Sequence, residues 1–114
     1  MLWLSAAIML LTAGVHSVLG ERRLIGPILA MNSGVVAKPL GRNVLRFAWH
    51  ITSLLMILSA LTLLWPGTDR TLIAIIGGAW LTAGIVDAVM TRGRHIGWPA
   101  LAAAGLLALT GAGA

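Results

Sequence analysis

The sequence contains four apolar stretches that are long enough, or nearly long enough, to cross a lipid bilayer. A transmembrane helix needs about 20 mostly apolar residues, because about 30 Å of hydrocarbon is crossed at about 1.5 Å per residue. The four stretches cover residues 2–19, 44–65, 71–90 and 96–113. Together they account for most of the chain. We therefore expect a single all-α domain over residues 1–114, folded as an integral membrane four-helix bundle.

The composition agrees with a bilayer environment and excludes several other classes of protein. Only 10% of the residues are charged, whereas a soluble domain carries about 25%. The chain has no cysteine, which excludes disulfides, thiolate metal sites and cysteine nucleophiles. The formal net charge of +5 does not indicate nucleic-acid binding, since lipid headgroups compete for basic residues beside membrane spans. The lipid bilayer is therefore the expected partner.

The connections between the stretches differ in length. Residues 66–70 and 91–95 form two short links, and short links favour antiparallel neighbouring helices. Residues 20–43 form a much longer first connection that contains Gly26-Pro27 and Lys38-Pro39. This connection is still partly apolar. We expect it to lie against the antiparallel bundle as an interfacial or re-entrant segment.

The basic residues predict the orientation in the membrane. Lys and Arg accumulate in the short cytoplasmic connections of membrane proteins. Only Arg70 belongs to the second connection, whereas the other basic residues flank the first and third connections: Arg22, Arg23, Lys38, Arg42 and Arg46 for the first, and Arg92 and Arg94 for the third. This asymmetry predicts that both termini lie outside, in a bacterial cytoplasmic (inner) membrane.

The ionisable residues of the spans gather at the predicted cytoplasmic end. Such residues are costly within a membrane and mark functional sites or protein-facing surfaces. On the second span, Arg46, His50 and Ser53 are four and three residues apart, so they share one helix face. We expect these ionisable residues to form one polar cluster, which consists of His16, Glu21, Arg46, His50, Asp87 and His95.

Two cofactor interpretations follow from this cluster. His16 and His50 on neighbouring helices could bind a b-type haem through both axial positions. Alternatively, His16, Glu21, His50 and Asp87 could bind a divalent metal ion, because imidazole and carboxylate suit zinc, manganese or iron. The alternative function is thus a haem-binding or metal-binding membrane protein. We find no catalytic motif, so an enzyme is not the favoured expectation.

The fourth stretch carries a stripe of small residues. Ala100, Ala104, Ala108 and Ala112 recur every four residues and fall on one helix face. Because the hydrophobic effect does not drive helix pairing in lipid, such stripes promote close helix contacts. The contact could lie inside the bundle or with another subunit or a second copy. We expect the chain to be an accessory or assembly subunit of a larger membrane complex.

Overall fold

The computed structural model describes all 114 residues, which form helices and short connections without any β-strand. The all-helical prediction is confirmed. The elements in chain order are α1 (Leu2–Gly20), the π-helix η1 (Glu21–Ile25), α2 (Gly26–Ala30), the 3₁₀-helix η2 (Gly34–Ala37), α3 (Pro39–Leu64), α4 (Arg70–Met90) and α5 (Trp98–Gly111).

Three helical segments are long and apolar enough to cross a membrane, as the sequence predicted. They cover Leu2–Ala30, Pro39–Leu64 and Arg70–Met90. The fourth helix, α5, has only 14 residues, or about 21 Å at the usual helical rise. It is shorter than the predicted span because Pro99 fixes its first turn, and Gly113 adopts a left-handed conformation (φ 82°) just after its end.

The prediction of a long first connection is wrong. The first helix continues through η1 and α2 as one segment of 29 residues, and only residues 31–38 connect it to α3. The Gly26 N–H donates to the Glu21 carbonyl, and a Cβ at Gly26 would lie only 2.8 Å from that oxygen. Glycine therefore permits a π-turn here, so the Gly-Pro pair lies within the helix. Pro39 begins α3, which is where a helix tolerates proline.

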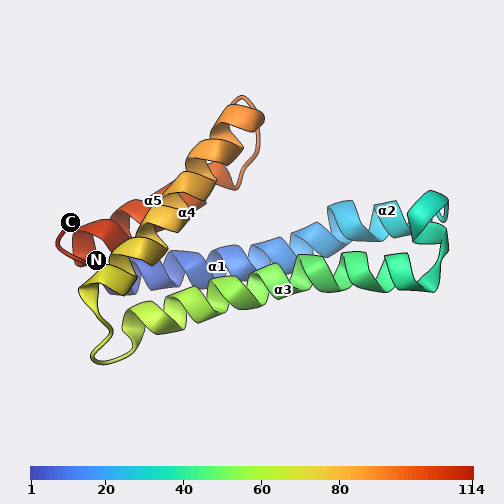
Figure 1. The fold of residues 1–114 in the computed structure, drawn as a ribbon. Coiled ribbons are helices and arrows are strands. Elements are labelled where there is room, and N and C mark those ends of the chain that lie inside the picture. The colour runs from blue at the N-terminus through green and yellow to red at the C-terminus, as the bar shows by residue number, and fades with distance from the viewer.

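The helices form two hairpins that diverge at one end (Figure 1). In the first hairpin, the segment from α1 to α2 packs against α3. Later residues of this segment contact earlier residues of α3. In the second hairpin, α4 packs against α5, which also packs against α1. The consecutive helices α3 and α4 barely touch. Both termini and the α3–α4 turn lie at one end, whereas the two hairpin tips point apart (Figure 1).

The core near the termini depends on small residues. A Cβ at Gly77 would lie 3.0 Å from the Gly105 carbonyl oxygen and 3.0 Å from the Leu109 backbone nitrogen, so the backbones of α4 and α5 lie close together. Ser5 Oγ donates to the Ala104 carbonyl at 2.7 Å and joins α1 to α5. The predicted alanine stripe thus packs inside the molecule: Ala104 and Ala108 are fully buried, Ala112 is 8% exposed and Ala100 is half-buried.

The turn between α3 and α4 is fixed by two local features. Gly67 adopts a φ of 82°, which glycine accepts without steric cost. Asp69 is the N-cap of α4, and its carboxylate accepts the Thr71 backbone N–H at 2.8 Å. This hydrogen bond lowers the pKa of Asp69 below its usual range. The short link therefore determines where α4 begins.

Candidate functional site

The first part of the site is a stacked aromatic pair between α1 and α3. The rings of His16 and Trp49 are nearly parallel, with centroids 4.1 Å apart. Trp49 Nε1 donates to the His16 carbonyl at 2.9 Å, and His16 Nε2 lies 3.2 Å from the Trp49 carbonyl. A carbonyl can only accept, so His16 carries its proton on Nε2. Gly20 makes room for this pair, because a Cβ there would overlap the indole.

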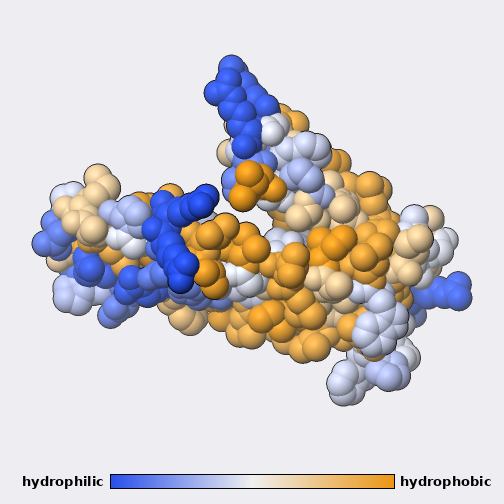
Figure 2. Space-filling view, turned by 180° about the vertical axis from the view of Figure 1, so that it is seen from behind, coloured by the Kyte–Doolittle hydropathy of each residue, from blue (hydrophilic) through white to orange (hydrophobic).

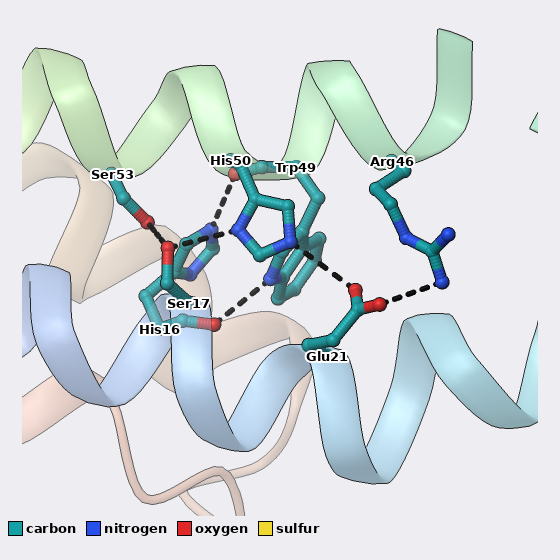
Figure 3. Close-up of polar contacts among 7 residues, drawn as sticks. All are labelled: His16, Ser17, Glu21, Arg46, Trp49, His50 and Ser53. Atoms are coloured by element: carbon teal, nitrogen blue, oxygen red, sulfur yellow. Dashed lines mark hydrogen bonds and ion pairs between the residues drawn. The ribbon is translucent and has the colours of Figure 1, made fainter. Parts of the chain in front are cut away.

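The second part is a line of polar side chains on the other side of the same helix contact (Figure 3). Ser17 Oγ lies 2.6 Å from Ser53 Oγ and 3.0 Å from His50 Nδ1. His50 Nε2 lies 3.2 Å from Glu21 Oε2, and Arg46 lies 2.7 Å from the other oxygen of Glu21. We call these five residues the polar line. It extends from the half-exposed Arg46 side chain to the buried Ser53 hydroxyl.

The protonation state of His50 sets the direction of the hydrogen bonds in the polar line. With Ser17 donating to Ser53, the Ser17 oxygen accepts from His50 Nδ1, and His50 donates from both nitrogens as an imidazolium. When His50 is neutral with its proton on Nε2, Nε2 donates to Glu21 and Nδ1 accepts from the Ser17 hydroxyl. The Ser53 hydroxyl then donates to the Ser17 oxygen. A proton on His50 therefore reorients two hydroxyl groups.

The predicted cluster separates into two groups. Glu21, Arg46 and His50 come together as expected. Asp87 pairs with His95 instead, at 2.6 Å between Oδ2 and Nδ1, on the diverging tip of the second hairpin. Because the two hairpins separate at this end, Asp87 and His95 do not join the single polar cluster that was predicted, and that part of the prediction is wrong.

The structure does not assemble the predicted metal-binding set. No group of three or more His, Asp or Glu side chains is close enough to hold a metal ion. In the predicted haem pair, Nε2 of His16 and Nε2 of His50 both lie against protein oxygens. Haem ligation through these two nitrogens would require both contacts to break. The haem interpretation stays a prediction.

All members of the polar line except Ser17 on α1 were singled out from the sequence. The four-three spacing correctly placed Arg46, His50 and Ser53 on one side of α3. Ser17 was overlooked, although it precedes Glu21 by four residues and so shares its helix face. This spacing was the available signal.

Comparison with known proteins gave no match to a family model, to a curated protein or to a solved structure. The function must be inferred from the geometry of this chain.

Proposed function

We propose that the chain is a four-span integral protein of the bacterial cytoplasmic membrane, with antiparallel helices and both termini outside. Three long apolar helices support this, and α5 would complete the fourth crossing. Both termini and the α3–α4 turn lie at the same end of the molecule. The opposite end carries most of the arginines, as expected for the cytoplasmic side.

The proposed orientation predicts which connections can be labelled from outside the cell. The cysteine-free chain allows single replacements at three exposed positions, Lys38→Cys, Pro66→Cys and Arg94→Cys. A membrane-impermeant maleimide should label Pro66→Cys on intact cells, and the other two only after permeabilisation. The unsubstituted chain is the control and should remain unlabelled. Labelling of Lys38→Cys on intact cells would contradict the orientation.

We further propose that the chain is an accessory subunit whose partner is another membrane-spanning protein. The supporting observation is the incomplete packing of α3, which contacts α1 but hardly touches α4. The exposed surface of α3 carries large apolar side chains along its length, namely Val44, Phe47, Leu54, Leu55, Leu58 and Leu61. Such a surface can receive a partner helix through van der Waals packing, which drives association in lipid. The alanine stripe of α5 is already used inside the molecule.

Photo-crosslinking in native membranes tests this proposal. A photoreactive amino acid at Leu58, which is 48% exposed, should give one discrete adduct with another membrane protein. The same amino acid at Ala60, which is fully buried on the same helix, is the matched control and should give no intermolecular adduct. Adducts with lipid alone would contradict the proposal. An adduct of twice the chain mass would replace the accessory role with self-association.

A further inference from the structure

A cleft separates the two hairpins at the end where their tips diverge. It encloses about 540 Å³, within the range of about 300–1,000 Å³ that is typical of small-molecule sites. One wall comes from α1 and α3 and includes the stacked pair His16 and Trp49. The other wall comes from the α4–α5 connection and the start of α5. Figure 2 shows the hollow between the hydrophilic tip of one arm and the body of the molecule.

Two arginines line this cleft without an acidic partner. Arg23 enters from the first hairpin and Arg94 from the second. The Glu21 and Asp87 carboxylates contact other side chains, namely Arg46, His50 and His95. Asp87 is the only acidic residue of the lining, and its carboxylate already faces His95. The lining therefore contains one exposed arginine from each wall, and neither is paired with a carboxylate.

The remaining walls of the cleft are largely apolar. The apolar lining consists of Val15, Leu19, Leu24, Trp49, Met56, Ile96 and Leu101. A small hydrated anion could use the arginines but would leave these side chains uncovered. A molecule with both an anionic group and a hydrocarbon chain matches both kinds of surface. Arginine suits phosphate particularly well, because its planar fork of N–H donors matches two phosphate oxygens.

The position of the cleft indicates where such a molecule would come from. His16 lies near the end of the apolar stretch 2–19, at the level where the basic residues begin. In the proposed orientation this level is the cytoplasmic headgroup region. Basic pockets between transmembrane helices on that side bind anionic lipid headgroups. The depth of the cleft in the membrane rests on the proposed orientation, whereas its charge and shape do not depend on it.

We propose that this cleft binds one anionic phospholipid from the surrounding leaflet, with its phosphate between Arg23 and Arg94 and an acyl chain along the apolar wall. The site is distinct from the exposed α3 surface assigned to a partner protein. The lipid would occupy the space that opens because the hairpins diverge. Loss of lipid binding and loss of the partner adduct are therefore separate outcomes.

Native mass spectrometry of the full chain in detergent tests this site. The protein is offered phosphatidylglycerol or phosphatidylcholine with identical acyl chains. We expect one phosphatidylglycerol to be retained with at least tenfold higher affinity than phosphatidylcholine. The double variant Arg23→Gln/Arg94→Gln should weaken phosphatidylglycerol binding about tenfold or more, and phosphatidylcholine binding should hardly change.

The matched control removes two arginines that lie next to these positions but outside the cleft. Arg22→Gln/Arg92→Gln lowers the net charge by the same amount, and both residues are exposed; its affinity should stay within about twofold of the unsubstituted chain. Equal losses in the two double variants would show a general charge effect and overturn the site. Equal retention of both lipids would also overturn it. Displacement of the lipid by inorganic phosphate at the same concentration would show a free-anion site instead.

Discussion

Gly105→Ala should destabilise the folded chain by about 1–3 kcal/mol, which is the usual range for overpacking a tight contact. A Cβ at Gly105 would lie 2.7 Å from the Gly77 carbonyl oxygen and 2.8 Å from Leu81 Cα. These are backbone atoms of α4, so no side-chain rotation can relieve the overlap. The two helices would have to move apart. Unfolding in a mixed-micelle denaturant titration, followed by circular dichroism, measures the change.

Gly78→Ala is the matched control, because the substitution is identical and the position lies on α4 beside the same hairpin contact. Nothing lies within 4 Å of a Cβ at Gly78. The control should be neutral, or stabilising by up to about 1 kcal/mol through the higher helix propensity of alanine. If both variants lost the same stability, the backbone contact between α4 and α5 would not be what holds this hairpin together.

The helices could be predicted from the sequence because their signal is local. A mostly apolar stretch of 18 to 22 residues identifies each of the long spans wherever its neighbours lie. The error concerned Gly26-Pro27, where the usual helix-breaking residues lie within a continuous helix. A π-turn accommodates them. Because this turn has an extra residue, the apolar residues around it do not follow the regular α-helical spacing. The length of the first hairpin was therefore underestimated.

The candidate site was only partly predictable for a different reason. The face shared by Arg46, His50 and Ser53 follows from spacing along one helix. The partners on α1 depend on how α1 is rotated about its axis, which is set by tertiary packing. Asp87 was misplaced because equal depth in the membrane does not imply proximity. The divergence of the hairpins separates groups that a closed bundle would have brought together.

The stacked pair leads to the second strong expectation. Trp49→Leu should lower the free energy of unfolding by about 2 kcal/mol, since it removes the aromatic stack on His16 and the hydrogen bond to the His16 carbonyl. An aromatic pair contributes about 0.5–1.5 kcal/mol beyond its buried area, and a net hydrogen bond contributes about 1 kcal/mol. The same unfolding titration measures this loss.

Two further substitutions separate the causes. Trp49→Phe keeps a ring for stacking but has no N–H, so it should lose about 1 kcal/mol, the share of the hydrogen bond. Trp3→Leu makes the same change as Trp49→Leu at a position that is 76% exposed, and it should stay within about 0.5 kcal/mol of the unsubstituted chain. If Trp3→Leu were as costly as Trp49→Leu, the effect would belong to tryptophan at a membrane boundary in general. A loss of stability confined to Trp49→Leu would instead show that the His16–Trp49 pair stabilises the contact between α1 and α3 at the wall of the cleft. In that case Trp49→Leu should weaken phosphatidylglycerol retention as well, because the wall that carries Arg23 would no longer be held in place.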